Sequence, residues 1–170
     1  MLRIVIEEMV TKMAEQVAAK DTGCVHMFQQ KQKDELKLLF EVFKRNEDTF
    51  IHIINAMTPY ITSCGQAIVN DPENLKDPNM FTTKLLELKA ENDDMIAYAF
   101  QNHMQYQKAR DQTFTLFMNE QDMSPGYIAK HTHENLTKNF KGMDDESVAG
   151  ALEAIIGLFR LLHGRDAFIK

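Results

Sequence analysis

The sequence predicts an all-α protein, an antiparallel bundle of about seven to nine helices. Apolar residues recur every three or four positions in most segments, as they do along one face of an amphipathic helix. No segment shows the strict alternation of apolar and polar residues that is typical of a half-buried strand, and turn dipeptides such as Asn-Gly are absent. The connections between the periodic segments are short, which favours antiparallel neighbours.

The first part of the chain contains three helical segments. Residues 2–20 carry one apolar face and predict a first helix. Residues 25–28 predict a short helical turn, and the polar stretch at 29–33 predicts a loop. Asp34 is expected to cap the helix that follows, because an aspartate oxygen can accept the free N–H groups of a first turn.

A longer helix is expected from about residue 48 to residue 69, with Pro59 inside it. Proline has no N–H to donate and its ring crowds the preceding turn, so a kink or a break is expected. Thr58 followed by Pro59 also fits the start of a second helix. One kinked helix is favoured over two shorter ones.

The second half of the chain begins with a loop at 70–79, which contains two prolines and three acidic residues. Three helices are expected after it, at about 79–100, 103–119 and 124–140. They are separated by short polar stretches, as in an antiparallel bundle.

The last helix, expected from Asp144 to His163, is the most apolar of all. Asp144 or Asp145 is expected to cap it. A helix that is apolar on nearly all sides is normally buried, so the other helices are expected to pack around this one. Its predicted structural core consists of Leu152, Ile155, Phe159 and Leu162. The stretch 158–162 also fits the LxxLL pattern of helices that dock in grooves, but these leucines are expected in the core.

The composition excludes several classes of protein. With 25 acidic and 19 basic residues the net charge is −6, whereas nucleic-acid binding needs a basic face. No run of about 18 apolar residues predicts a membrane span. Cys24 and Cys64 fit no CxxC or zinc spacing, so they are interpreted as reduced, partly buried thiols.

The polar residues show no recognised catalytic pattern. His131 and His133 are two positions apart, so on a helix they point away from each other, cannot share a metal ion and are expected on the surface. Glu91, Asp93 and Asp94 are interpreted as a solvated face rather than a catalytic pair of carboxylates. The sequence therefore predicts no catalytic residue, no metal site and no cofactor.

Three stretches resemble the cullin family. Residues 155–170, IIGLFRLLHGRDAFIK, are similar to the end of the third cullin repeat. Residues 124–155 resemble its Ser-Pro-x-x-(Ile/Leu)-Ala-Lys segment and the acidic linker after it, and residues 99–119 resemble a segment that ends in Phe-x-x-Phe-(Ile/Met)-Asn. Within the family, the Leu-His-Gly-Arg-Asp at 162–166 is most similar to the fourth cullin paralogue.

The resemblance implies a helical bundle of the cullin-repeat type and a division into three parts. Residues 1–22 would form a helix that ends the preceding repeat or starts this one, and residues 23–163 would form the repeat itself. Residues 164–170 would begin the connection to a C-terminal domain missing from this sequence, which makes Phe168 and Ile169 candidates for interdomain contact.

The resemblance also implies a function. A cullin is a non-catalytic, rigid scaffold of a RING-type E3 ubiquitin ligase, which spaces a substrate adaptor from the RING protein and its conjugating enzyme. The adaptor and the RING protein would be bound by other parts of a full-length cullin, and the protein would be cytoplasmic and nuclear. Two alternatives stay open from the residues alone: a free-standing helical adaptor that binds a partner in a groove, and a metal or cofactor enzyme built in a helical bundle.

Overall fold

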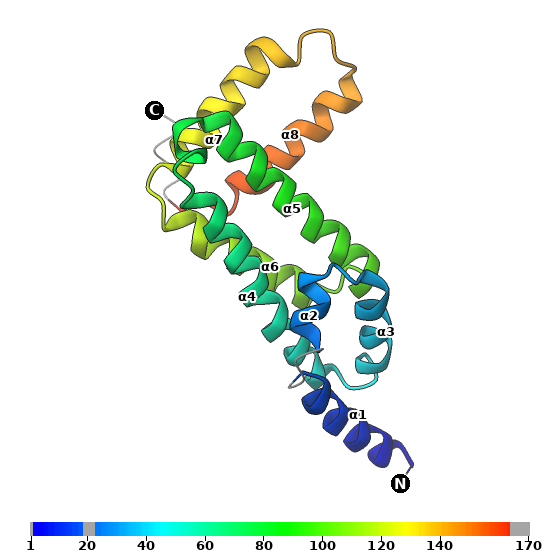
Figure 1. Ribbon diagram of the computed structural model, residues 1–170. Coiled ribbons are helices and arrows are strands. Elements are labelled where there is room, and N and C mark those ends of the chain that lie inside the picture. Colours follow the sequence, from blue (N-terminus) through cyan, green and yellow to red (C-terminus); the bar gives the residue numbers. More distant parts are fainter. Residues whose placement is uncertain (1, 19–22, 164–170) are drawn as a thin grey trace. The chain divides into compact units, whose positions relative to one another are not determined.

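The all-α fold class is confirmed by a computed structural model that describes residues 2–18 and 23–163 (Figure 1). These residues form eight α-helices and no strand. The first four helices are α1 (Leu2–Ala18), α2 (Cys24–Gln29), α3 (Lys33–Phe43) and α4 (Phe50–Val69). The other four are α5 (Pro78–Phe100), α6 (Met104–Asn119), α7 (Ser124–Glu134) and α8 (Asp145–Phe159).

Pro59 lies inside α4, which continues as one helix on both sides of it. The expectation of one helix rather than two is therefore confirmed. Single 3₁₀ turns at Glu47–Thr49 and Asn74–Lys76 precede α4 and α5.

The helix expected at 124–140 changes its winding after α7. The segment Asn135–Asn139 is π-helical, and the Phe140 N–H donates to the carbonyl of Asn135, five residues back, at 3.0 Å. The side chains of Asn135 and Thr137 donate to backbone carbonyls one turn earlier, at 3.0 and 2.8 Å. Polar side chains that bond the backbone in this way disturb regular α-helical winding.

Of the two helix caps expected from aspartates, one is confirmed and one is wrong. Asp144 caps α8: one carboxylate oxygen accepts from the Ser147 N–H at 2.9 Å and the other from its hydroxyl at 2.7 Å. These hydrogen bonds, that of the hydroxyl first, lower the pKa of Asp144. Asp34 caps nothing, because α3 begins one residue earlier and Gln32 occupies the cap position. Its carboxylate accepts instead from the hydroxyl of Tyr98 on α5, at 2.6 Å.

The chain divides into two compact units. Unit 1 comprises Met1–Ile61 and Asn92–Arg110, and unit 2 comprises Thr62–Glu91 and Asp111–Lys170. Helices α4, α5 and α6 each contribute residues to both units. The boundaries predicted at residues 22 and 163 lie at other positions in the sequence, and they stay a prediction.

Unit 1 is built around aromatic side chains. Phe40 of α3 lies 5.3 Å from Phe50 of α4 and 5.8 Å from both Phe100 of α5 and Tyr106 of α6, measured between ring centroids. Phe100 and Tyr106 stack on each other at 4.3 Å, and Phe28 of α2 lies 6.2 Å from Phe100. All five rings are at most 2% exposed. Offset and edge-to-face pairs add to what burial of such large side chains already contributes. This cluster therefore joins α2 and α3 to the unit 1 parts of α4, α5 and α6.

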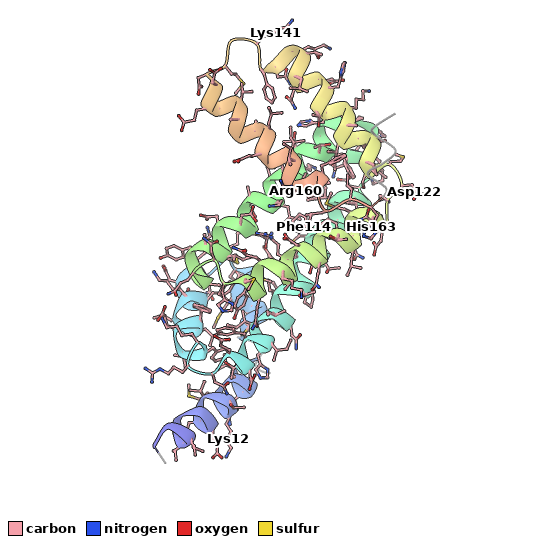
Figure 2. The ribbon with its side chains drawn as sticks, turned by 180° about the vertical axis from the view of Figure 1, so that it is seen from behind. Lys12, Phe114, Asp122, Lys141, Arg160 and His163 are labelled. Carbon is pink, nitrogen blue, oxygen red and sulfur yellow. The ribbon has the colours of Figure 1, made fainter. Side chains whose placement is uncertain are left out.

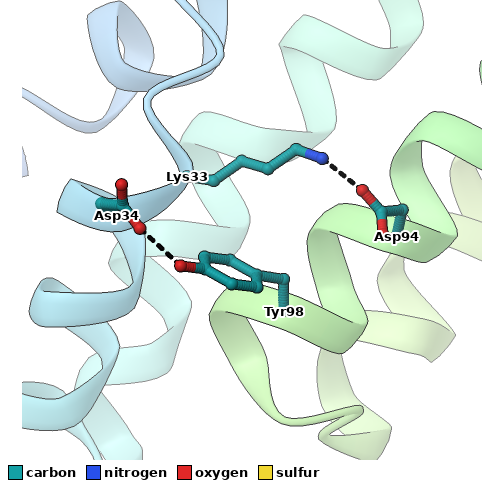
Figure 3. Close-up of polar contacts among 4 residues, drawn as sticks. All are labelled: Lys33, Asp34, Asp94 and Tyr98. Atoms are coloured by element: carbon teal, nitrogen blue, oxygen red, sulfur yellow. Dashed lines mark hydrogen bonds and ion pairs between the residues drawn. The ribbon is translucent and has the colours of Figure 1, made fainter.

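Polar contacts at the surface of unit 1 connect α3 with α5 (Figure 3). Lys33 forms an ion pair with Asp94, and Tyr98 donates its hydroxyl to Asp34. The ammonium group of Lys37 lies 4.7 Å from the centroid of the Tyr98 ring. Because these groups are largely exposed, each contact contributes little to stability, but together they fix how the two helices are aligned.

Replacing Tyr106 by phenylalanine is expected to leave the protein as stable or to stabilise it by about 1 kcal/mol. The Tyr106 side chain is fully buried, its hydroxyl has no hydrogen-bond partner among the described residues, and burial raises its pKa. An unpaired buried hydroxyl costs free energy that phenylalanine does not. Urea unfolding of Tyr106→Phe measures the difference, and a clear loss of stability would show that the hydroxyl is satisfied in solution.

Unit 2 has a separate core, to which five helices contribute. The Phe114 side chain, labelled in Figure 2, is fully buried and lies 4.9 Å from the ring of Phe117. The other buried apolar residues of this unit are Val69, Phe81, Leu85, Leu88, Met118, Ile128, Ile155, Leu158 and Leu162.

Helix α8 is not the helix around which the others pack, so that expectation is wrong for the described residues. Its range buries Ile155 and Leu158, whereas Ile156 is 47% exposed. Within unit 2, α8 packs beside α7. Apolar residues around the whole circumference indicate that a helix is buried by other parts of a protein, but they do not show that those parts lie in the same stretch of sequence.

Candidate functional site

The four residues predicted as structural core on and just after α8 differ in burial. Ile155 is 5% exposed and Leu162 is 1% exposed. Leu152 and Phe159 are half-buried. The LxxLL leucines at the two ends of the motif, Leu158 and Leu162, are both buried, which leaves them unavailable to a groove on another protein in this conformation. Phe168 and Ile169, the candidates for interdomain contact, lie outside the described residues.

An apolar groove of about 320 Å³ lies between α7 and α8. It is lined by Ala129, Thr132, His133, Leu136, Ile155, Ile156 and Phe159. Leu136 and Ile156, which both line it, are 53% and 47% exposed, so the groove presents apolar surface to solvent. The groove has no carboxylate in its lining and only one titratable group, His133. Its chemistry is that of a surface that packs against another apolar surface.

A second apolar surface lies on α1 in unit 1. Val5, Met9 and Met13 follow each other at intervals of four residues and are 49%, 60% and 48% exposed. Residues four apart lie on the same face of a helix, so these three form one row. Val10 and Ala14, on another face, are buried, with exposed fractions of 6% and 0%. The helix is therefore held by one face while a second apolar face is uncovered.

His131 is not a surface histidine, so that expectation is wrong. Its side chain is buried, and its Nδ1 lies 2.9 Å from the side-chain oxygen of Asn79. The amide nitrogen of Asn79 donates to the carboxylate of Glu134. Because a carboxylate can only accept, the Asn79 oxygen must face the imidazole, which then carries its proton on Nδ1. This network joins the first turn of α5 to α7. His133 is exposed, as expected.

Acidification is expected to weaken unit 2 through His131. Burial lowers its pKa below the ordinary value, against the opposing effect of the carboxylates of Glu134 and Asp77. Between the ordinary value of about 6.5 and the lower native pKa, the unfolded chain binds a proton that the native protein does not, so stability falls as the pH falls. The free energy of unfolding should therefore drop more in the wild type than in His131→Gln between about pH 7.5 and pH 5.5.

The matched control for this pH experiment is His133→Gln, which changes an exposed histidine on the same helix. It should keep the pH dependence of the wild type. Equal pH dependence in the wild type and in His131→Gln would contradict the assignment of His131 as the buried titrating group. Urea unfolding followed by circular dichroism at each pH provides the free energies.

The acidic residues and the cysteines in the described ranges do not gather into a metal site. No group of three His, Cys, Asp or Glu side chains that could hold a metal ion occurs there. The acidic residues at 91–94 are not a carboxylate pair: Asp93 forms an ion pair with Arg110, and Asp94 with Lys33. Cys24 is buried, Cys64 is half-buried, and both are free; burial raises the pKa of Cys24.

None of the helices in residues 2–18 and 23–163 combines the length and the apolar character needed to cross a membrane.

Comparison with known proteins identifies the family. The whole sequence, residues 1–170, matches the family described as the Cullin alpha solenoid domain. The chain belongs to the cullin family. It is similar to Cullin-3A of Arabidopsis thaliana, with 30% identity over 168 residues, which are 98% of this chain and 23% of that protein. It is also similar to Cullin-3 of Dictyostelium discoideum, with 30% identity over 89% of this chain and 20% of that protein.

Human Cullin-4A is 29% identical over 147 residues, which are 86% of this chain and 19% of that protein. Cullin-3 and Cullin-4A relatives thus match at nearly the same identity, which does not single out the fourth paralogue favoured by the sequence motif at 162–166. The chain spans about one fifth of the length of these relatives.

Proposed function

We propose that this chain is a non-catalytic, rigid scaffold segment of a cullin-RING E3 ubiquitin ligase, acting in the cytoplasm and the nucleus. It would space a substrate adaptor from the RING protein and its conjugating enzyme, both of which other parts of a longer cullin would hold. The match of the entire chain to the Cullin alpha solenoid domain carries this proposal.

A spacer acts by limiting the volume that its two ends can explore. Holding a substrate near a charged conjugating enzyme raises the effective concentration of its lysines, and a stiff connection does so better than a flexible one of the wrong length. One feature of this chain supports stiffness within each unit. Each unit has its own core of fully buried side chains. Close-packed interiors yield little under load.

The two uncovered apolar surfaces fit a segment that has neighbours on both sides. In a solenoid each repeat packs only against the repeats next to it, so each end exposes apolar surface when it is alone. We assign the α1 row of Val5, Met9 and Met13 to the joint with a preceding repeat. We assign the α7–α8 groove, together with Phe168 and Ile169, to the joint with a following domain. Ile155, Leu158 and Leu162 would then serve the function by keeping α8 in place.

A chimera tests the spacing function directly. The segment of Arabidopsis Cullin-3A that matches this chain would be replaced by residues 1–170, and ubiquitination of a bound substrate would be measured with purified components. The chimera should retain activity. The matched control replaces the same segment by a flexible Gly-Ser linker of equal contour length, which should lose most of it. Equal activity of the helical and the flexible versions would contradict the proposal.

The α7–α8 groove also favours a second candidate, a helical adaptor that binds a partner in this groove. Ile156→Glu separates the two, because it places a charge on an exposed wall of the groove without removing a buried side chain. If the chain is an adaptor, the Ile156→Glu variant should lose its binding partner. If it is a scaffold segment, the chimera that carries Ile156→Glu should be weakened at the joint with the following domain and should lose thermal stability. A variant that folds, binds the same proteins and supports full ubiquitination would count against both roles of the groove.

A further inference from the structure

The side chain of Asn119, the last residue of α6, forms three hydrogen bonds with the backbone, two of them with residues far away in the sequence. Its side-chain NH₂ donates to the carbonyl of Leu161 at 3.0 Å and to that of Thr115, one turn back in α6, at 2.5 Å. Its side-chain oxygen accepts the backbone N–H of His163 at 2.7 Å. Both N–H groups and the oxygen of this amide are thus engaged, two of the three bonds with a segment more than forty residues away.

Both of these bonds reach the turn that follows α8, just beyond its last residue Phe159. In this turn the N–H of Leu161 donates to the carbonyl of Leu158 at 3.0 Å, and that of Leu162 to the carbonyl of Phe159 at 3.2 Å. The amide of Asn119 binds the carbonyl of Leu161 and so caps this turn from another helix. Leu162, between the two bonded residues, is 1% exposed. Figure 2 labels Arg160, which follows α8 directly, and His163.

We infer that Asn119 is a positioning residue: its side chain ties the turn after α8 to the end of α6 and so fixes the direction of the chain up to His163. The bonds on Leu161 and His163 lie on both sides of the buried Leu162, so they restrain this turn against rotation as well as against fraying. The importance of this direction rests on the proposed function, because only a scaffold needs the next domain held at a set angle.

Hydrogen exchange tests the clamp in the isolated chain. In Asn119→Ala, amides in peptides covering 160–163 should exchange on the order of tenfold faster than in the wild type, as expected for the loss of two modest hydrogen bonds. Amides in the core of unit 2, such as those of residues 81–88, should be unaffected. Asn55→Ala, an exposed asparagine on α4 in unit 1, is the matched control and should change neither region. Unchanged exchange at 160–163, or an equal increase throughout unit 2, would overturn the inference.

Asn119→Asp provides a readout that general destabilisation would not give. An ionised carboxylate can still accept the His163 N–H but has no hydrogen for the carbonyls of Leu161 and Thr115. A protonated carboxyl regains one donor. The protection factors at 160–163 in this variant, corrected for the intrinsic pH dependence of exchange, should therefore increase as the pH is lowered far enough to protonate the new carboxyl, while those of the wild type should not. The same pH dependence in both proteins would count against the clamp.

The chimera with Arabidopsis Cullin-3A connects the clamp to function. Asn119→Ala in the chimera should lower substrate ubiquitination several-fold while the adaptor and the RING protein stay bound. If the chimera without this substitution is inactive, the proposed function fails and the exchange result at 160–163 still decides whether the clamp exists. If both chimeras are equally active although exchange is faster in Asn119→Ala, the assigned importance of the exit direction is wrong.

Discussion

Replacing Phe40 by alanine is expected to lower the free energy of unfolding of unit 1 by about 3–5 kcal/mol, the range typical of a buried phenylalanine. The Phe40 side chain is 2% exposed and lies within 6.3 Å, between ring centroids, of Phe50, Phe100, Tyr106 and His103. The loss has two parts, the transfer free energy of the buried ring and the cost of the cavity that it leaves. The cavity is expected to stay open because the neighbouring rings from three helices also pack against each other and cannot all move into it.

Two further variants make this expectation specific. Phe40→Leu keeps most of the volume and should cost clearly less than alanine, since it loses the ring contacts and creates a smaller cavity. Leu38→Ala, two residues earlier on α3, removes a side chain that is 68% exposed and should change stability by no more than about 0.5 kcal/mol. Urea unfolding of the three variants measures these differences in the free energy of unfolding. If Phe40→Ala lowers it as little as Leu38→Ala does, the aromatic cluster is not what stabilises unit 1.

The helices could be predicted from the sequence because their signals are local. Apolar periodicity, the loop at 70–79 and the first-turn position of Pro78 each depend on a few neighbouring residues, and the observed helices begin and end close to where these signals stand. The cap at Asp144 is local in the same sense. Asp34 is not a cap because α3 already begins at Lys33, and its carboxylate binds the hydroxyl of a distant residue, Tyr98.

The features that define the candidate surfaces could not be predicted, because they depend on what lies next to each helix in space. Burial of His131 requires Asn79, which is 52 residues away, and the cap supplied by Asn119 reaches Leu161 across 42 residues. Asn119 had one available signal, its place at the end of the segment that resembles Phe-x-x-Phe-Met-Asn, but that resemblance assigns it no role. The exposure of Ile156 shows the same limit for the whole of α8. The sequence predicts its apolar residues correctly, but no described residue buries the side chain of Ile156.

Replacing Gly65 by alanine is expected to destabilise unit 2 by about 1–3 kcal/mol, the usual cost of overpacking a core. Gly65 lies in α4, and a Cβ at this position would come closer than 3.0 Å to three atoms of the Phe117 ring, a separation that real Cβ atoms essentially never show. Phe117 is 1% exposed and packs against Phe114, so its ring has little room to turn away. Alanine favours helices over glycine by about 1 kcal/mol, and the clash is expected to outweigh that gain.

Gly150→Ala is the matched control, because a Cβ on this exposed α8 glycine would meet nothing within 4 Å. It should stabilise the protein by about 0.5–1 kcal/mol, so the same substitution in two helices is expected to have opposite signs. A double-mutant cycle with Phe117→Leu locates the cause. If the Phe117 ring is what excludes a methyl group at Gly65, then Gly65→Ala should cost much less in the Phe117→Leu background. Additive losses would mean that α4 and α6 meet differently in unit 2, and that Gly65 is needed for its backbone rather than for the space it leaves.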